Sequence, residues 1–203
     1  MSIPTIVINR LPVYLRELLR LEAEGQSVTS SQELARRLGM SSAQIRKDLS
    51  HFGEFGKQGT GYRIDFLRQH LQKILKVERE WDVALIGAGD LGQAIAHNNS
   101  FAARGFRITC IFDSSSARIG TTIAKLVVQS TDLLEVTLRE KNIRIGLLAI
   151  PAEHAQKVTD RLVKAGIVSI LNYAPVNLSV PETVRVQYMD PVIQLQRMTY
   201  YHL

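Results

Sequence analysis

Apolar residues near the N-terminus recur every three or four positions, which is the spacing of one face of an α-helix. A first helix ending at Gly25 would carry this pattern on Leu11, Tyr14, Leu15, Leu18 and Leu19. Ser30 followed by Glu33 has the spacing of a capping box and predicts the start of a second helix. Ser41 followed by Gln44 predicts a third helix directly after it. Two short capped helices joined by a tight turn predict a helix-turn-helix.

Each of these helices has an apolar face that we expect to be buried. The second and third helices would bury Leu34, Ala35, Leu38, Ile45, Leu49 and Phe52. The glycine-rich basic run 56–63 predicts a hairpin tip, and a hairpin after a helix-turn-helix makes a winged helix. Asp65 can cap a further helix with Phe66, Leu67, Leu71, Ile74 and Leu75 directed inward. The charged segment 76–82 is the predicted linker.

From residue 83 onward, short apolar runs alternate with helical patterns. The predicted strands are near 83–87, 107–112, 143–150, 167–171 and 184–188. The predicted helices are near 91–102, 131–141, 152–165 and 191–201, the last one following Pro191. This alternation predicts an α/β fold, a doubly wound parallel sheet covered by helices on both faces.

A glycine-rich run follows the first of these strands directly, with the sequence Gly87-Ala88-Gly89-Asp90-Leu91-Gly92. Its first glycine permits a tight turn, its second lets the backbone approach a pyrophosphate, and its third lets helix and strand pack closely. Asp113 ends the next apolar run about 20 residues further on, where an acidic residue binds ribose hydroxyls in dinucleotide-binding Rossmann domains.

An acidic residue at the ribose would repel a 2′-phosphate, so NAD(H) is favoured over NADP(H) as the cofactor. Arg118 weakens that preference, and Asp113 as a simple turn residue at the strand end is the structural alternative. Asp90 should weaken anion binding unless its side chain points to solvent. The complete predicted cofactor set is the glycine-rich run with Asp113, Ser114, Arg118, Ile119, Ile150, Pro151, Asn172, Tyr173, Ala174 and Pro175, the last four lining the nicotinamide with Pro151.

The third helix, roughly 42–52, is the predicted recognition helix, because such a helix fits the major groove of DNA. Arg46 could bind guanine with two hydrogen bonds, and Lys47 could do the same or hold a phosphate. A solvated helix face is the alternative interpretation of this pair. The complete predicted DNA-binding set is Arg10, Ser30, Ser31, Ser42, Gln44, Arg46, Lys47, Ser50, Lys57, Gly59, Tyr62 and Arg63, with Arg10 placed just before the first helix.

Composition narrows the function classes. The 203 residues carry a net charge of +6, with basic clusters near 36–47 and 57–63 that would attract a phosphate-rich partner. No apolar run reaches the ~18 residues of a membrane span, and no signal peptide is evident, so we expect a cytoplasmic protein. Cys110, the only cysteine, lies in an apolar strand and is expected to be core. His154 and His97 are the best candidates for a general acid or base, but neither has an orienting carboxylate nearby in sequence, and no metal-ligand spacing occurs.

Taken together, these motifs resemble the Rex family of redox-sensing transcriptional repressors. The stretches that carry the resemblance are 14–16, 30–34, 44–53, 59–62, the glycine-rich run, Phe112-Asp113 and 166–175. The resemblance implies a homodimer that binds palindromic operator DNA and is released by NADH. It also implies three parts: residues 1–78 as the winged-helix DNA-binding domain, 79–190 as the NAD(H)-binding Rossmann domain, and 191–203 as a helix swapped onto the partner.

The resemblance further implies a switch between subunits that uses Arg16 and Asp190. Many family members have a tyrosine where this chain has Asn98, which can form hydrogen bonds but cannot stack on a nicotinamide. Two other functions stay open on the residues alone. One is a minor NAD-dependent dehydrogenase, and the other is a DNA-binding regulator that senses another nucleotide, such as coenzyme A.

Overall fold

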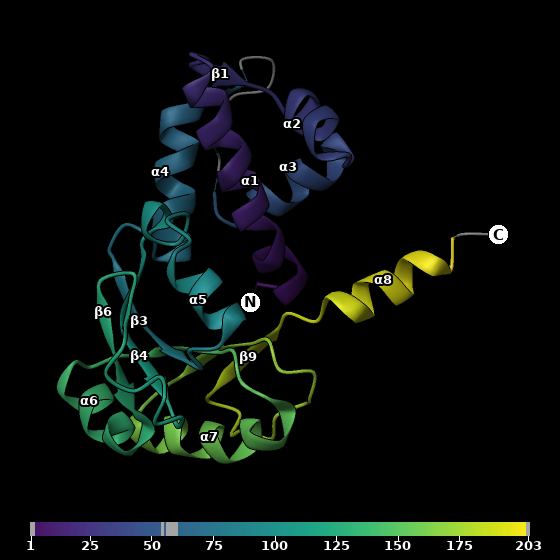
Figure 1. The fold of residues 1–203 in the computed structure, drawn as a ribbon. Coiled ribbons are helices and arrows are strands. Elements are labelled where there is room, and N and C mark those ends of the chain that lie inside the picture. Colours follow the sequence, from purple (N-terminus) through teal and green to yellow (C-terminus); the bar gives the residue numbers. More distant parts are fainter. Residues whose placement is uncertain (1–2, 54, 56–60, 202–203) are drawn as a thin grey trace. The chain divides into compact units, whose positions relative to one another are not determined.

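A computed structural model describes residues 3–53, 55 and 61–201 of the chain (Figure 1). The chain forms two compact units, Met1–Arg79 and Glu80–Leu203. The first unit is mainly helical, and the second is built on a seven-stranded sheet.

The first unit contains the expected helix-turn-helix. Its elements in chain order are α1 (Thr5–Ala23), β1 (Val28–Thr29), α2 (Ser31–Leu38), α3 (Ser42–Ser50), β2 (Tyr62–Arg63) and α4 (Ile64–Leu75). Both predicted N-caps are confirmed: the Ser30 hydroxyl accepts a hydrogen bond from the Glu33 amide, and the Ser41 hydroxyl accepts one from the Gln44 amide. The Glu33 carboxylate, however, accepts from the Thr29 hydroxyl, so the capping box is only half formed.

Four expectations for the first unit are wrong in detail. α1 begins at Thr5 and continues through Pro12, and its buried face extends back to Val7, so Arg10 lies inside the helix. Leu19 and Phe66 are exposed, and Ile64 takes the buried place at the start of α4. Arg63, rather than Asp65, is the N-cap of that helix.

The core of the first unit joins all four helices. Its buried apolar members are Leu11, Tyr14, Leu15, Leu18, Leu21, Leu34, Ala35, Ile45, Leu49, Phe55, Ile64, Leu67 and Leu71, with Leu38, Phe52, Ile74 and Leu75 packed at its edge. One carboxylate is buried with them: Asp48 of α3 is fully inaccessible and binds Arg10 and Tyr14 of α1. Helices α1 and α3 are therefore joined by polar as well as apolar contacts.

β1 and β2 pair antiparallel at the base of the predicted wing, with Thr29 opposite Tyr62. Gly61 enters this pairing at a φ of +73°, and a Cβ there would press against the Thr29 carbonyl, so the position requires glycine. The wing tip, with Lys57 and Gly59, lies outside the described residues.

The second unit is a doubly wound sheet with strand order β5-β6-β4-β3-β7-β8-β9. The strands are β3 (Trp81–Ile86), β4 (Phe106–Asp113), β5 (Thr122–Ile123), β6 (Leu126–Ser130), β7 (Ile145–Leu148), β8 (Ser169–Asn172) and β9 (Arg185–Tyr188). All neighbours pair parallel except β5, which forms an antiparallel hairpin with β6. The sequence analysis missed this hairpin, and it assigned Trp81 and Asp82 to the linker, although both belong to β3.

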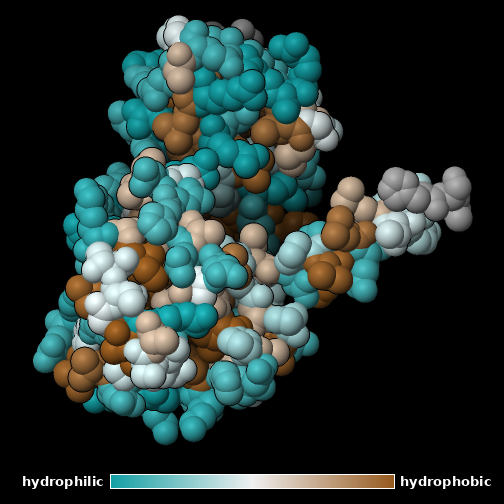
Figure 2. Space-filling model, in the orientation of Figure 1, coloured by the Kyte–Doolittle hydropathy of each residue, from teal (hydrophilic) through white to brown (hydrophobic). Residues whose placement is uncertain are grey.

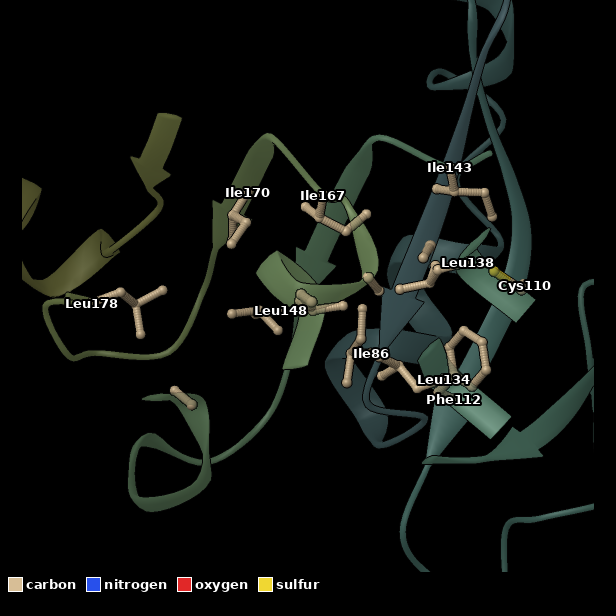
Figure 3. Packing of buried hydrophobic residues seen from close by; sticks show 14 of the residues in the cluster. Ile86, Cys110, Phe112, Leu134, Leu138, Ile143, Leu148, Ile167, Ile170 and Leu178 are labelled. Carbon is tan, nitrogen blue, oxygen red and sulfur yellow. The ribbon is translucent and has the colours of Figure 1, made fainter. Parts of the chain in front are cut away.

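The two faces of the sheet are covered by different helices, as expected for this fold (Figure 1). Alternate residues of the central strands, including Ile86, Phe112 and Leu148, pack against α6 (Leu134–Glu140) and α7 (Ala152–Ala165) (Figure 3). The intervening residues, including Val83 and Leu85, pack with Ile95 of α5 (Asp90–Ala96) on the other face. Cys110 is core, as expected, and burial raises the pKa of its thiol to about 12.

Two helices are shorter than the sequence pattern indicated. The expected helix 91–102 ends at Ala96, and the short 3-10 helix η1 (Ala102–Arg104) follows separately. The break falls at Asn98, whose side chain accepts a hydrogen bond from the Ser100 amide and so favours a turn. The predicted helix 131–141 begins as the 3-10 helix η2 (Thr131–Leu133) and continues as α6.

The last helix, α8 (Pro191–Thr199), buries none of its residues. Its apolar side chains Val192, Ile193, Leu195 and Met198 are all exposed. Figure 2 shows hydrophobic surface on this helix. Asp190 caps this helix by accepting hydrogen bonds from the Val192 and Ile193 amides. The N-cap and Pro191 therefore favour a helix here, but no described residue covers its apolar face.

Acid should weaken the first unit through Asp48. Burial alone would raise the pKa of this carboxyl, but the hydrogen bonds from Arg10, Tyr14 and Gln44 outweigh it and hold the pKa below 3.8. The stability that this group contributes is therefore present above about pH 4 and is lost as the pH falls toward the folded-state pKa.

At neutral pH, Asp48→Asn should cost about 3–5 kcal/mol, because it leaves the Arg10 charge without its partner. We expect the difference in melting temperature between the wild type and this variant, measured by far-ultraviolet circular dichroism, to narrow as the pH is lowered from 7 to 3. A difference that is constant over this range would contradict the assignment.

Candidate functional site

The glycine-rich run turns the chain from β3 into α5 at the carboxyl edge of the sheet. Gly87 has a φ of +103°, and a Cβ there would lie closer than 3.0 Å to the Ala149 carbonyl of the neighbouring strand connection. A Cβ on Gly92 would lie equally close to the Gly87 carbonyl. Both glycines are therefore required by close backbone approach, as the sequence analysis expected for a tight turn and for helix–strand packing.

The second glycine of the run is different. The nearest atom to a Cβ on Gly89 would be Nη2 of Arg118, at 3.8 Å. That atom belongs to a half-exposed side chain rather than to backbone. Packing therefore does not require glycine at position 89. The missing side chain leaves open space next to the loop backbone.

Asp113 ends β4 beside this loop and is almost fully buried, with 7% of its surface exposed. Its Oδ2 accepts a hydrogen bond from the Ala88 amide at 2.7 Å, and its Oδ1 accepts one from the Ser115 amide at 2.8 Å. The carboxylate therefore connects the loop after β3 with the loop after β4. A residue that only formed a turn at the end of its own strand would not make the bond to Ala88. Oδ2 also accepts a long hydrogen bond, at 3.5 Å, from the Arg118 guanidinium, whereas Oδ1 has a second lone pair that can still accept a hydrogen bond.

A cavity of about 570 Å³ opens between these loops, where strand order reverses between β3 and β7. This is the position at which doubly wound sheets bind ligands. The cavity is lined by Ile86, Gly87, Gly89, Phe112, Asp113, Ser114, Ser115, Arg118, Thr131, Ala149, Ile150, Pro151, His154, Lys157, Val158 and Arg161. Seven of the predicted cofactor residues are in this set: Gly87, Gly89, Asp113, Ser114, Arg118, Ile150 and Pro151.

The other predicted cofactor residues do not line the cavity. Ala88 and Gly92 are buried in the turn, while Asp90 and Leu91 are exposed. Because the side chain of Asp90 is exposed to solvent, it should not oppose the binding of an anion. Ile119 lies at the surface with 36% exposed.

The turn after β8 has a structural role that the sequence analysis did not foresee. The buried Asn172 donates to the Ala174 and Val176 carbonyls and accepts from the Ala174 amide. Tyr173 packs on the α5 face of the sheet, and burial raises the pKa of its phenol. The segment 172–175 therefore holds its own turn and stands apart from the described cavity.

One wall of the cavity is formed by α7, of which only His154 was considered from the sequence, as a candidate acid or base. His154, Lys157, Val158 and Arg161 recur at helical spacing after Pro151, a signal that could have been found once 152–165 was placed next to the carboxyl edge. Arg161 is held by two hydrogen bonds to the Glu135 carboxylate and by one to the Thr131 carbonyl. These contacts fix the far end of the wall.

The charges around the cavity favour an anionic ligand. Arg118 lies 3.5 Å from Asp113 and balances that carboxylate. Glu135 balances Arg161, and its own pKa is lowered by the hydrogen bond from that arginine. Lys157, an exposed residue of the wall, adds a further positive charge.

The two histidines considered for catalysis have no acid–base partner in the described part of the chain. His97 caps the C-terminus of α5, and its Nδ1 is paired with the Gln93 carbonyl. His154 lines the cavity on its exposed side. Among the described residues, no cluster of His, Cys, Asp or Glu could hold a metal ion, and no helix is long and apolar enough to cross a membrane.

The predicted DNA-binding face lies on α3. Arg46, Lys47 and Ser50 are exposed on the side opposite the buried Ile45 and Leu49. The Arg46 guanidinium donates to the Ser31 hydroxyl of α2 at 3.1 Å, which orients it across the helix-turn-helix. Ser30 and Ser42 lie at the N-termini of α2 and α3.

Several of the predicted DNA-binding side chains have partners inside the unit. Arg10 donates two hydrogen bonds to Asp48, and the side-chain amide of Gln44 donates one at 2.7 Å. Arg63, at the base of the wing, pairs with Asp65. Tyr62 is partly buried against the core of the first unit.

The residues that the resemblance assigns to the switch lie at the surface of their own units. Arg16 is exposed on α1, and Asn98 is exposed just after α5. Asp190 is engaged as the N-cap of α8.

Comparison with protein-family models divides the chain in the same way. The family described as "Putative DNA-binding protein N-terminus" matches residues 2–50, and that described as "CoA binding domain" matches residues 78–176. A helix-turn-helix unit followed by a nucleotide-binding sheet defines the class of ligand-responsive DNA-binding regulators.

Individual relatives are more specific. The chain is 52% identical to the redox-sensing transcriptional repressor Rex of Roseiflexus sp. (strain RS-1), over 98% of this chain and 90% of that one. It is 46% identical to Rex 1 of Thermotoga maritima, over 98% and 95%. The chain belongs to the Rex family of redox-sensing transcriptional repressors, as its motifs indicated.

Solved structures agree with this assignment. The structure matches that of RSP in complex with β-NAD⁺ and operator DNA with a TM-score of 0.94 and 38% identity, covering 99% of this chain and 93% of that one. It matches RSP in complex with β-NADH with a TM-score of 0.90 and 36% identity, covering 99% and 94%. The winged helix and the Rossmann sheet expected from the sequence are both confirmed by these matches.

The glycine-rich loop allows a matched pair of variants. Gly92→Ala should lower stability by about 1–3 kcal/mol, because its Cβ would press on the Gly87 carbonyl and force the backbone to move. Gly89→Ala should leave stability nearly unchanged, because its surroundings are open. Thermal unfolding of both variants tests this expectation, and equal losses in the two would contradict the described loop geometry.

Proposed function

We propose that this protein is a homodimeric repressor that binds palindromic operator DNA and releases it when NADH occupies the cavity of the second unit. The observation that carries the proposal is the cavity itself, with its glycine-rich loop and buried Asp113, in a chain whose other unit presents an arginine-bearing helix-turn-helix. RSP, which this chain matches over nearly its full length, has been crystallised with operator DNA and with β-NADH.

The cavity fits the adenosine end of NAD(H). The open space over Gly89 leaves room for a pyrophosphate against the loop backbone, with Arg118 facing it. Oδ1 of Asp113 retains a lone pair that can accept a hydrogen bond from a ribose hydroxyl. Ile150, Pro151 and Val158 offer apolar surface for the adenine. We infer that the turn 172–175 borders the nicotinamide, since it follows β8 at the same edge of the sheet.

Asp113 also supports a preference for NAD(H) over NADP(H), because its carboxylate would repel a 2′-phosphate. Arg118, half-exposed and 3.5 Å from this carboxylate, offsets part of that repulsion. The ratio of NADH to NAD⁺ affinity decides the response, since a ligand shifts a two-state protein only by its differential affinity for the two states.

We assign DNA recognition to the exposed face of α3. Arg46 is exposed and oriented by Ser31, and Lys47 and Ser50 lie on the same face. In this assignment Arg46 reads a base edge, and Lys47 contacts a base or a phosphate. Lys57, Gly59, Tyr62 and Arg63 form the wing contacts in the proposal.

We assign the homodimer to α8, within residues 191–203. Its apolar side chains are exposed, and a second copy of the chain would cover them.

Arg16 and Asp190 belong to the proposed switch between subunits, together with Asn98. Residues 1–78 then form the DNA-binding domain and 79–190 the NAD(H)-binding domain. A repressor acts on chromosomal DNA, which supports a cytoplasmic location.

We further propose that the protein does not turn over its nucleotide. Neither His154 nor His97 has a carboxylate partner among the described residues. Binding and release, without hydride transfer, would then be the whole of its chemistry.

The direct test is fluorescence anisotropy of a labelled operator at fixed salt, with NADH, NAD⁺, NADPH or coenzyme A added. Salt must be constant because phosphate contacts make DNA affinity strongly salt-dependent. We expect NADH to release the DNA at concentrations at which NAD⁺ and coenzyme A do not. Release by coenzyme A alone would instead support a regulator of the kind named by the second family model.

Asp113→Ala should weaken NADH-induced release by roughly 10- to 100-fold, because each hydrogen bond to a charged group contributes about 1.5–3 kcal/mol. DNA affinity without nucleotide should stay near the wild-type value. Asp160→Ala, which removes an exposed carboxylate outside the cavity lining, is the matched control. A normal NADH response in Asp113→Ala would remove Asp113 from the site.

Arg46→Ala should weaken operator binding by about 1–3 kcal/mol and relax the preference at one base pair of each half-site. Arg20→Ala removes an exposed arginine of α1 with the same change of net charge and should have a smaller effect. Binding isotherms of both variants on the operator measure the difference. An unchanged isotherm for Arg46→Ala would exclude its role.

A further inference from the structure

Asp48 is a buried carboxylate in the helix to which we assign DNA recognition. It is fully inaccessible to solvent, although it lies between the exposed Lys47 and the buried Leu49. Four hydrogen bonds reach its two oxygens: two from the Arg10 guanidinium, one from the Tyr14 hydroxyl at 2.6 Å and one from the Gln44 side-chain amide at 2.7 Å. Two of the donor residues belong to α1 and one to α3 itself.

An apolar residue would serve packing at least as well at this position. Ile45 and Leu49, on the same face of α3, are apolar and fully packed. A buried ion pair is often no more stable than apolar residues of the same volume, because removing charges from water is costly. The carboxylate adds directional contacts. Hydrogen bonds fix the rotation and the axial position of α3 against α1 more tightly than apolar contacts do.

The same bonds hold two side chains that the sequence alone presents as DNA contacts. The Arg10 guanidinium donates through Nε and one terminal nitrogen to Asp48, and its side chain is only 21% exposed. Gln44 lies one helical turn before Asp48, and its amide nitrogen is directed to the carboxylate. The Arg10 Nε and Nη2 groups and the Gln44 side-chain nitrogen therefore cannot turn toward DNA without breaking a charge-assisted bond to Asp48.

We propose that Asp48 is a positioning residue for operator recognition, which locks α3 onto α1, and that Arg10 and Gln44 serve this lock instead of reading bases. The proposal rests on the proposed function, because it concerns how α3 meets DNA. Its consequence is that the lock acts on the whole base-reading face at once, whereas a direct reader such as Arg46 acts at one base pair. Productive polar contacts tolerate errors of only about 0.5 Å, so a small rotation of α3 would disturb every contact.

The experiment uses the full-length protein and the duplex that the wild type selects from a randomised library. Binding is then measured on that duplex, on every single base-pair variant of one half-site, and on a scrambled duplex of equal length, at one salt concentration. The protein variants are Asp48→Asn, Tyr14→Phe and Gln44→Ala. Glu22→Gln, which neutralises an exposed, ion-paired carboxylate of α1, is the matched control for charge.

We expect Asp48→Asn to lower the ratio of selected-duplex to scrambled-duplex affinity about tenfold or more, with the loss spread over all positions of the half-site. Tyr14→Phe and Gln44→Ala should show smaller losses with the same spread, and Glu22→Gln should show none. Affinity for the scrambled duplex should stay within about twofold of the wild type in all four, because the exposed phosphate-binding cations are untouched.

Three outcomes would overturn the proposal. If Gln44→Ala relaxes the preference at a single base pair only, Gln44 is a direct reader. If folded Asp48→Asn and Tyr14→Phe both keep every base preference, the lock does not position the helix. If affinities for both duplexes fall together with the folded fraction, measured by circular dichroism, Asp48 acts on stability alone. A wild type that selects no sequence would instead contradict the proposed function.

Discussion

The close approach between Gly92 and the Gly87 carbonyl is the constraint on which the nucleotide-binding unit depends. A side chain at either glycine would push α5 away from β3 or β3 away from the Ala149 carbonyl. With both side chains absent, the loop can close tightly at the point where the strand order reverses. The Ala88 amide then reaches the Asp113 carboxylate at the end of the next strand. The shape of the cavity therefore depends on close backbone packing, and the side chains that line it act within that shape.

Charge is arranged differently in the two units. In the first unit, the buried Asp48 draws in Arg10, so that a cation that could face DNA becomes part of the core boundary. In the second, Glu135 holds Arg161 and Asp113 faces Arg118, so that the cavity keeps positive charge without an unpaired buried ion. In both units, arginines that could meet a phosphate are paired with carboxylates. This arrangement suits a protein whose two ligands, DNA and a dinucleotide, are both polyanions.

Local signals in the sequence predicted most of the elements correctly. Ser30 and Ser41 cap α2 and α3 as expected, and α7 has the predicted bounds, because caps and helical periodicity depend on neighbouring residues alone. The missed hairpin of β5 and β6 is short, and its turn uses Ala124 and Lys125 at positive φ, residues that carry no turn signal. Leu19 and Phe66 were expected to be buried because helical spacing cannot tell which side of a broad apolar stripe meets the core.

The sequence by itself determined the family, the order of the two units, and the glycine-rich loop with Asp113, since each of these is written in contiguous residues with specific spacing. Only the tertiary structure decided which of the candidate side chains remain free. Arg10 and Gln44 look like DNA contacts along the chain, but Asp48 captures both across the helix pair. The α7 wall of the cavity and the self-contained turn at Asn172 were equally hidden. Such outcomes depend on contacts between residues far apart in sequence, and linear spacing carries no information about which of two possible partners is nearer in space.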